Sequence, residues 1–369
     1  MGMRHWAAGI VAAACLAAAT VRADPLTYEM VTVGNPNNIA DLSGYGSVGY
    51  EYRIGRYDVT IGQYAAFLTA VAATSDPYGL YNPSMGTDLN VAGITRTLLS
   101  GTYTYTVMNN GGDSANRPIT YVSWFDAARF ANWMSNGQGS GSTETGAYTL
   151  GGQTSGVAPS RNYGASYTLP TRDEWYKAAY FSQDKDGVNM PGYWLYGTQS
   201  SSTPGSVIGS PSAANWKAST GYSVTQSSTY SVSQNYLTDV GAFVSSASHY
   251  GAYDMSGNVF QWNDLDGTPS VNRDLRGGSW ENYQSQFLSS YGGGPGLATM
   301  EGPKFGFRLA GPSSTPVPEI DPAGMGSVLA LVAGALGVLE HRRARALRPA
   351  PARRLPAPSR PVTAARRAR

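Results

Sequence analysis

Residues 167–180 read YTLPTRDEWYKAAY and place a helix directly after a short extended segment. Thr171 is a residue type that caps helices, and Glu174 stands three residues later, where its side chain can return a hydrogen bond to the cap. The apolar positions that follow share one face of the expected helix and are Trp175, Ala178, Ala179 and Tyr180. This stretch therefore predicts a strand at Tyr167–Leu169 followed by a capped helix with one buried face.

Two other segments repeat this capping pattern and predict two further helices. Thr60 is followed by Gln63, and Ser123 is followed by Asp126, with the second helix expected to stop before Gly137. The apolar face of the first helix consists of Tyr64, Phe67, Leu68 and Val71, and that of the second of Phe125, Phe130, Trp133 and Met134. Most of the remaining chain must therefore lie in strands and loops.

The region between these helices is rich in Gly, Ser, Thr, Tyr and Asn and shows little helical periodicity. The other strand candidates are short: Tyr28–Val33, Tyr50–Val59, Leu275–Trp280 and Phe305–Ala310. Long loops cover 137–166 and 197–235, and the aromatic residues in and near them (Tyr193, Trp194, Tyr196 and Trp216) indicate that parts of these loops pack. Residues 24–311 are expected to form one irregular α+β domain, large enough to build a core without disulfides.

Six motifs follow one another along this region: YEYRIGRYDVTIGQYAAFL (50–68), RPITYVSWFDAARFANWMS (117–135), YTLPTRDEWYKAAY (167–180), YGAYDMSGNVFQWND (250–264), LRGGSWEN (275–282) and FGFRLA (305–310). In this order they resemble the sulfatase-modifying factor, or formylglycine-generating enzyme, family. The resemblance implies a C-type-lectin-like α+β domain with few short helices, short strands and long loops. Physically, Gly257 and Gly277–Gly278 suit tight turns, and Arg276 and Arg308 are expected to make structural charge-assisted hydrogen bonds.

The resemblance also implies a chemistry, the oxidation of a substrate cysteine to formylglycine with O₂ and a copper ion held by two cysteines. Aligned on Gly277-Gly278-Ser279, these two positions fall on Asn282 and Phe287. Neither side chain offers the soft thiolate that selects Cu(I), and the chain has a single cysteine, Cys15, near its start. We therefore expect no copper and no oxidase activity. Asn282 and Phe287 are expected to lie near one another beside a surface groove, at the vestige of the catalytic site.

Calcium is a second property that the resemblance implies. The family's Gly-Asn-x-x-Glu motif here reads Gly257-Asn258-Val259-Phe260-Gln261, with an amide in place of the acid. The other family site begins at an Asn that matches Asn215. Amide oxygens can bind Ca²⁺, but the lost charge lowers affinity. Calcium bound by Asn258, Gln261 and Asn215 therefore stays open against the alternative of a turn held by direct hydrogen bonds.

The start of the chain has the layout of a secretory signal peptide. A basic Arg4 precedes an apolar stretch, and Val21-Arg22-Ala23 suits cleavage before Asp24. A transmembrane anchor is the alternative, but the apolar stretch is short and Ala-rich. Residues 1–23 are therefore expected to direct export.

The C-terminal end combines a Ser/Pro linker (312–321), a short apolar segment (322–340) expected to span the membrane, and a basic tail (341–369). Pro318-Glu319, the apolar segment and the arginine cluster together resemble a PEP-CTERM sorting tail, which implies an exosortase-type enzyme as partner. The motif reads VPEIDP where many tails have Pro-Glu-Pro. An ordinary single-pass anchor is the alternative, and the arginines place the tail in the cytoplasm in both cases.

Charge and histidine content exclude several function classes. The net charge of +2 is misleading, because residues 341–369 hold ten Arg and no acid, which leaves 16 basic and 24 acidic groups in residues 1–340, a balance of −8. Without Arg4 and Arg22 the exported domain stands at −10, which argues against nucleic-acid binding. Its one histidine, His249, cannot build an all-histidine metal site, and no G-x-S-x-G motif accompanies it.

Two function hypotheses follow. The leading one is a non-catalytic binding or structural module on the cell envelope, which contacts extracellular polysaccharide or a surface protein through its aromatic and polar loops. The alternative is an enzyme, either the family oxidase by a divergent route or an unknown activity that uses Asp254, Asp264, Asp266 and Glu281. A deep pocket that converges on perturbed carboxylates would favour the enzyme.

Overall fold

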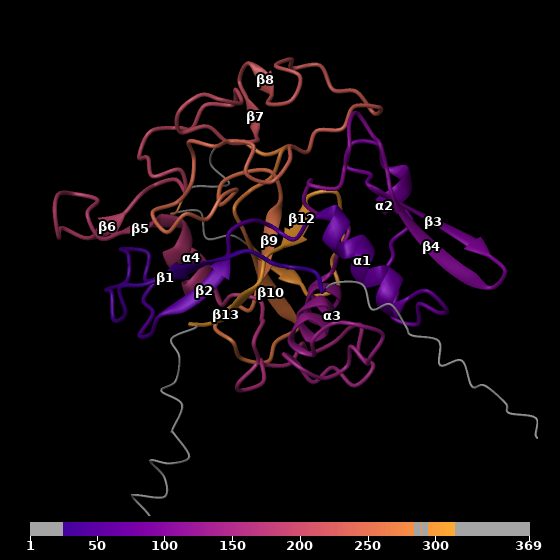
Figure 1. Cartoon of the computed structure of the whole chain (residues 1–369). Coiled ribbons are helices and arrows are strands. Elements are labelled where there is room, and N and C mark those ends of the chain that lie inside the picture. The colour runs from indigo at the N-terminus through magenta and orange to yellow at the C-terminus, as the bar shows by residue number, and fades with distance from the viewer. Residues whose placement is uncertain (1–24, 284–288, 290–293, 314–369) are drawn as a thin grey trace, which may run out of the picture. The chain divides into compact units, whose positions relative to one another are not determined.

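A four-stranded sheet runs through the centre of the domain in the order β11–β10–β9–β12 (Figure 1). The structure, a computed structural model, describes residues 25–283, 289 and 294–313. The strands of this sheet are β9 (Phe260–Asn263), β10 (Asn272–Arg276), β11 (Gly294–Leu297) and β12 (Phe305–Phe307). β9 pairs antiparallel with β10 and parallel with β12, so the 250–264 motif lies in the middle of the sheet.

A second sheet brings together strands from the N-terminal and C-terminal parts of the described chain. It contains β1 (Met30–Val33), β2 (Tyr52–Gly55) and β13 (Ala310–Pro312), with β2 in the middle and antiparallel to both neighbours. β12 and β13 follow each other closely in sequence but belong to different sheets, so the segment predicted as one strand, Phe305–Ala310, is two.

The three predicted helices are confirmed as α1 (Ile61–Val71), α3 (Trp124–Ser135) and α4 (Arg172–Tyr180). Each begins with both hydrogen bonds of the predicted capping box, formed by Thr60 with Gln63, Ser123 with Asp126 and Thr171 with Glu174. One further short helix, α2 (Ser84–Thr87), carries no such cap and was not predicted. Local side-chain chemistry is thus sufficient to place the longer helices.

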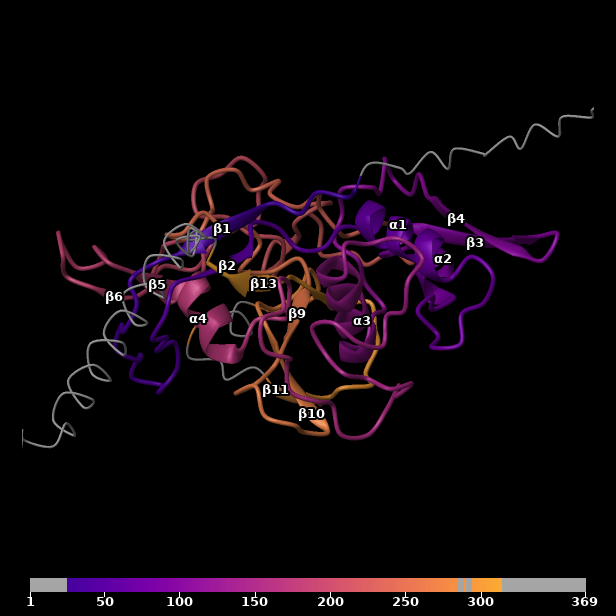
Figure 2. The same cartoon turned by 60° about the horizontal axis from the view of Figure 1, so that its bottom comes forward.

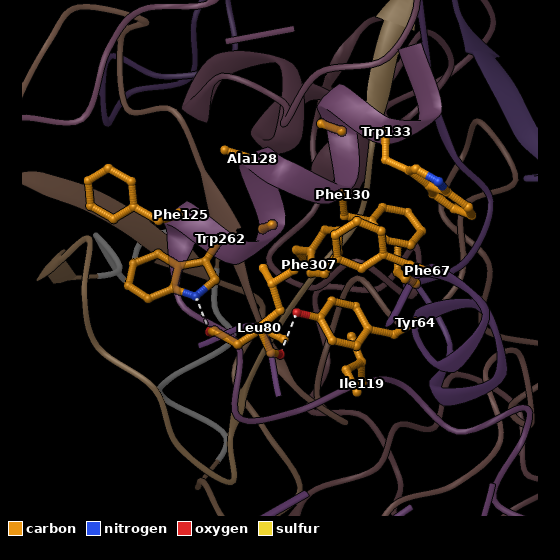
Figure 3. Close-up of a cluster of buried hydrophobic side chains, with 14 of the residues drawn as sticks. Tyr64, Phe67, Leu80, Ile119, Phe125, Ala128, Phe130, Trp133, Trp262 and Phe307 are labelled. Atoms are coloured by element: carbon orange, nitrogen blue, oxygen red, sulfur yellow. Dashed lines mark hydrogen bonds between the residues drawn. The ribbon is translucent and has the colours of Figure 1, made fainter. Parts of the chain in front are cut away.

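The main core lies between α1, α3 and the central sheet (Figure 3). Phe67 and Trp133 meet with ring centroids 5.4 Å apart, and Phe130 lies 5.4 Å from Phe307 of β12. The hydroxyl of the buried Tyr64 is also hydrogen-bonded, because it donates to the carbonyl of Leu80 at 2.9 Å. Burial of such rings with their hydrogen bonds satisfied anchors both helices to the sheet.

In the part of the chain that the structure describes, three antiparallel hairpins flank these sheets: β3 (Ile94–Leu99) with β4 (Thr102–Val107), β5 (Phe181–Ser182) with β6 (Gly192–Tyr193), and β7 (Lys217–Ala218) with β8 (Gly221–Tyr222). Figure 2 shows α1, α2 and the β3–β4 hairpin at one end of the domain, and α4 with β5–β6 at the other.

Several strand predictions were too long. Tyr28–Val33 shortens to β1 and Tyr50–Val59 to β2, while Tyr167–Leu169 makes only an isolated bridge from Thr168 to Ala310. The strand predicted at Leu275–Trp280 ends at Arg276, because Gly277 and Gly278 adopt φ of +101° and +73°, a conformation that stops a strand.

Among the residues that the structure describes, no helix is long and apolar enough to cross a membrane. The predicted signal peptide (1–23) and the predicted spanning segment (322–340) lie outside the described residues.

Candidate functional site

Asn282, the first position that aligns with a copper cysteine, closes a tight turn after β10. The Ser279 hydroxyl donates to its amide oxygen at 2.5 Å, and its own N–H donates to the Ser279 carbonyl at 3.1 Å. The N–H of Lys217 donates to the Asn282 carbonyl at 3.1 Å, which ties the turn to β7. Asn282 is 9% exposed, so it is a packed neutral residue. Phe287 lies outside the described residues, so the expected proximity of the two positions stays a prediction.

A stack of aromatic rings leads from the core to the surface beside this turn. The rings of Trp280 and Tyr236 lie parallel, with centroids 4.9 Å apart, and Tyr230 stacks on Tyr236 at 5.8 Å. Nearby, the Lys217 ammonium lies 5.9 Å from the ring centroid of Tyr283. Tyr230 and Tyr283 are both exposed. No sequence motif predicts this stack, although tyrosines recur from 222 to 236.

Two of the three residues considered for calcium, Asn215 and Asn258, are in contact. The amide nitrogen of Asn215 donates to Asn258 Oδ1 at 3.0 Å, and the N–H of Thr238 donates to the same oxygen at 3.3 Å. A Cβ on Gly257 would lie 2.3 Å from the carbonyl oxygen of Asn215, so this close approach requires glycine. Both asparagine side chains are buried in the turn and engaged in direct hydrogen bonds.

Gln261 is engaged in a different set of contacts. Its amide oxygen accepts hydrogen bonds from Trp175 Nε1 and from Arg308 Nε, each at 2.6 Å. Its amide nitrogen donates to the carbonyl of Asp254 at 2.7 Å. Ca²⁺ requires six to eight oxygen ligands, and an oxygen that already faces a guanidinium is poorly suited to it. The residues present therefore do not fit calcium, and the arrangement is that of a turn held by direct hydrogen bonds.

Within the described residues, no group of three or more His, Cys, Asp or Glu side chains could hold a metal ion.

Arg308 makes the structural hydrogen bonds that its motif predicts. Besides Gln261, it donates to the carbonyls of Gly55 at 2.9 Å and Tyr253 at 2.7 Å, and it pairs with Asp58 Oδ1 at 2.8 Å. Burial raises the pKa of the Asp58 carboxyl to about 8, although the charge of Arg308 opposes this rise. This buried pair holds β2 and β12 near the 250–264 motif.

Arg276 also serves the fold. Its Nε donates to Asp274 Oδ2 at 3.0 Å, and its guanidinium lies 4.9 Å from the ring centroid of Tyr45 and 5.3 Å from that of Tyr176. These contacts join β10 to α4.

The four acids considered for an enzyme differ in their surroundings, and two of them are buried. Asp254 accepts from the N–H of Gly241 at 2.7 Å, and its burial raises its carboxyl pKa to about 6. Asp264 accepts from Trp124 and Tyr148 at 2.9 and 2.6 Å.

The other two acids lie at the surface. Asp266 accepts from Thr268, and those hydrogen bonds lower its pKa, whereas Glu281 pairs with Lys304 at 3.1 Å. The four acids thus accept hydrogen bonds from, or form ion pairs with, different groups.

His249 lies beside a buried serine. Its Nδ1 lies 3.3 Å from the hydroxyl of Ser182, and burial lowers its pKa. Ser182 is itself buried in β5.

Two cavities of similar volume open elsewhere on the described part of the domain. One, of about 600 Å³, lies between Tyr28, Asp58, Gln63 and Asp239. The other, of about 580 Å³, lies between Tyr50, Arg161, Tyr163 and Pro312. Neither is lined by Asn282 or by any of the four acids considered for an enzyme.

The chain matches one known protein family over most of its length. Residues 46–312 match the family described as "Sulfatase-modifying factor enzyme 1-like domain". No curated protein sequence matches the chain.

Similar solved structures include CarF (20% identity, 78% of this chain and 99% of that chain covered, TM-score 0.45) and Treponema denticola variable protein 1 (17%, 78% and 95%, 0.42). PvdO from Pseudomonas aeruginosa is also similar (18%, 78% and 93%, 0.37). Likeness at this level has no bearing on activity.

Proposed function

The chain belongs to the sulfatase-modifying factor enzyme 1-like domain family, and from that premise we propose that it is a non-catalytic binding module displayed on the cell envelope. Its partner is an extracellular polymer, either a polysaccharide or a surface protein. The chain is exported by residues 1–23, held by the apolar segment 322–340 and sorted through Pro318-Glu319.

The single observation that carries this proposal is the state of Asn282. A carboxamide stands where the family's chemistry needs a thiolate, and its oxygen is already used by Ser279. The only cysteine, Cys15, lies in the predicted signal peptide, so the mature domain has no thiolate to recruit from elsewhere. Oxidation of a substrate cysteine through a thiolate-held Cu(I) therefore lacks its ligands.

Support for a binding role comes from the surface tyrosines. Tyr50, Tyr163, Tyr230 and Tyr283 are exposed on a domain whose loops are otherwise polar. Rigid aromatic side chains among Ser, Gly and Asn are the composition that recognition surfaces use.

The aromatic residues that the sequence first suggested have another role. Tyr196 and Trp216 are buried in one hydrophobic cluster. Tyr193 lies against the rings of Tyr176 and Phe181. These packed rings stabilise the loops, so the exposed tyrosines are the aromatic residues that can contact a partner.

The test is a binding screen with the full-length protein against polysaccharides and against surface proteins of the same cells. We expect saturable binding to at least one polymer that survives alanine substitution of Glu281, an acid of the enzyme hypothesis. Turnover of a bound polymer, abolished by that substitution, would instead support the enzyme.

A further inference from the structure

A cavity of about 580 Å³ opens where the start of β2, the loop 161–165 and the end of β13 meet. β2 and β13 pair side by side there (Figure 1). The cavity volume falls within the range of small-molecule sites, roughly 300–1,000 Å³. Asn282, Asn258 and Gln261 are not among the residues that line it, so it is separate from the positions that align with the family's copper and calcium sites.

Two exposed tyrosine rings line this cavity. Tyr50 is about half exposed, and Tyr163 is fully exposed. The ring of Tyr50 is held in place, because its hydroxyl donates to Glu174 at 2.7 Å and its edge meets the ring of Tyr52 with centroids 6.2 Å apart. The face of a tyrosine ring carries partial negative charge and attracts a cation within about 6 Å. The two rings therefore suit both a cation and the carbon-bound hydrogens of a ligand.

The buried charges behind these rings compensate one another. Arg161 donates to Glu174 in two hydrogen bonds of 2.9 and 3.1 Å, and its Nε lies 3.5 Å from Asp264. The Nε of Arg273 lies 3.7 Å from the same Asp264 carboxylate. Burial favours protonation of Glu174, but Arg161 outweighs it and lowers the Glu174 pKa. This set of two guanidinium groups and two carboxylates therefore carries little net charge.

Glu51 adds a charge that this set does not balance. It is exposed and lines the cavity, and one of its carboxylate oxygens accepts from the hydroxyl of Ser313 at 2.6 Å. Two further charges lie beside the cavity: Arg53, whose Nε donates to a backbone carbonyl of β13 at 3.0 Å, and Asp173, which lies close enough to act on Tyr50. These two charges are opposite and offset each other. The negative charge of Glu51 remains, and a carboxylate beside aromatic rings favours a cationic ligand.

The size and lining of the cavity favour a sugar over a peptide side chain. One lysine side chain would leave most of the volume empty, whereas a pyranose ring and its neighbour along a polymer would occupy far more of it. Gly164, Ala165 and Pro312 join the two tyrosines in the lining, which gives the ligand a surface made largely of carbon. The faces of a pyranose ring carry carbon-bound hydrogens, which pack on such a surface.

We propose that this cavity binds an amino-sugar unit of a polysaccharide through its protonated amine, which rests on and sharpens the binding role proposed above. The ammonium group pairs with the Glu51 carboxylate, and the carbon-bound face of the sugar packs on the exposed rings of Tyr50 and Tyr163. The acidic balance of the exported domain attracts such a polymer from a distance, an effect that salt weakens.

The experiment uses the full-length protein at pH 6 and low salt, in a polyoxyethylene detergent that carries neither sugar nor charge. Glucosamine oligomers, whose amines are mostly protonated at this pH, are compared by titration calorimetry with N-acetylglucosamine oligomers of the same length, which are uncharged. Oligolysine tests the alternative of a basic protein as partner.

Four variants locate the site. Glu51→Gln removes the charge and keeps an oxygen for the Ser313 hydroxyl. Tyr163→Ala removes a ring, and Tyr163→Phe keeps it. Glu29→Gln is the matched control, because Glu29 is an exposed glutamate that lines the other cavity, of about 600 Å³.

We expect the glucosamine oligomers to bind more tightly than the N-acetylated oligomers. Glu51→Gln should weaken this binding by roughly 3- to 10-fold and Tyr163→Ala by roughly 2- to 5-fold, while Tyr163→Phe and Glu29→Gln leave it unchanged. All four variants change exposed side chains, so their melting temperatures should stay close to that of the wild type. Added salt should weaken binding to the wild type more than binding to Glu51→Gln.

Equal affinity for the two oligomer sets, or equal affinity of the wild type and Glu51→Gln, would overturn the assignment of this cavity. A loss that follows Glu29→Gln alone would move the site to the other cavity, and binding of oligolysine without glucosamine oligomers would identify a protein partner instead. In each of these cases the binding role would stand. No binding to any polymer of the wider screen would defeat both proposals.

Discussion

Arg308 and Asp58 form an ion pair of 2.8 Å in which neither side chain has any exposed surface. The pair is incomplete, because Asp58 Oδ2 has no hydrogen-bond partner. Asp254 lies close enough to raise the Asp58 pKa further. This contact is costly to break, since removal of Asp58 leaves a buried donor of Arg308 without its acceptor.

Removal of the Asp58 carboxyl should therefore be destabilising. Asp58→Ala leaves a donor of the buried Arg308 guanidinium without its acceptor and is expected to lower the free energy of unfolding by about 1–3 kcal/mol near pH 5. Asp58→Asn keeps an oxygen for Arg308 and should cost far less near pH 5. Chemical denaturation of both variants measures this, and equal losses would contradict the role given to the pair.

The same carboxyl predicts a pH dependence of stability. The folded pKa of Asp58 is about 8, above its ordinary value of 3.8, so the folded state binds this proton more tightly than the unfolded state. Its contribution is present in full below pH 3.8 and is lost as the pH rises through 8, at up to about 1.4 kcal/mol per pH unit. Asp126 and Asp254, with pKa values raised by burial to about 7 and about 6, act in the same direction.

Unfolding curves between pH 5 and 8 should thus show a loss of stability for the wild type. The Asp58→Asn variant should lose less stability in the upper part of this pH range, because the asparagine side chain does not titrate. A wild-type curve that rises across the window would show that Asp58 is ionised throughout in the folded protein.

How far the sequence predicts this structure depends on whether the deciding contacts are local. The caps at Thr60, Ser123 and Thr171 are local, and the sequence locates all three helices. The family motifs also predict the fold. The β3–β4 hairpin was not among the predicted elements, although TYTYTV (102–107) alternates and Ser100-Gly101 precedes it as a turn signal.

The candidate sites were harder to predict because they depend on distant contacts. The sequence identifies Gln261 as a changed residue, but the donors that occupy its oxygen come from α4 and the segment after β12. The cavity lined by Arg161 cannot be predicted from the sequence, because it forms only where the loop 161–165, the start of β2 and the end of β13 meet in space.

Calcium should have little effect on this protein. The amide oxygens of Asn258 and Gln261 already accept two hydrogen bonds each. A chelator should leave the melting temperature of the full-length protein unchanged, and added Ca²⁺ should not raise it. A concentration-dependent rise in melting temperature, absent with Mg²⁺, would restore calcium to the turn, because a ligand that binds the folded state stabilises it.

Oxidase activity should be absent. The full-length protein, with or without added copper, is not expected to convert the cysteine of a sulfatase-motif peptide to formylglycine, because Asn282 cannot ligate Cu(I). Mass spectrometry of the peptide measures the conversion. Product that forms with the native protein and disappears in a heat-inactivated control would contradict the proposal.

The C-terminal tail should act as a sorting device. Pro318-Glu319, the short apolar segment and the arginine cluster stand in the order that such tails require, and a plain anchor does not need the Pro-Glu pair. In a host with an exosortase-type enzyme, the mature protein should lack residues beyond about Glu319, while a host without one should keep it membrane-held by 322–340. Peptide mapping of the native protein distinguishes the two. Arg-rich peptides from 341–369 in the final surface form would reduce the segment to an ordinary anchor, and the binding role of the domain would be unaffected.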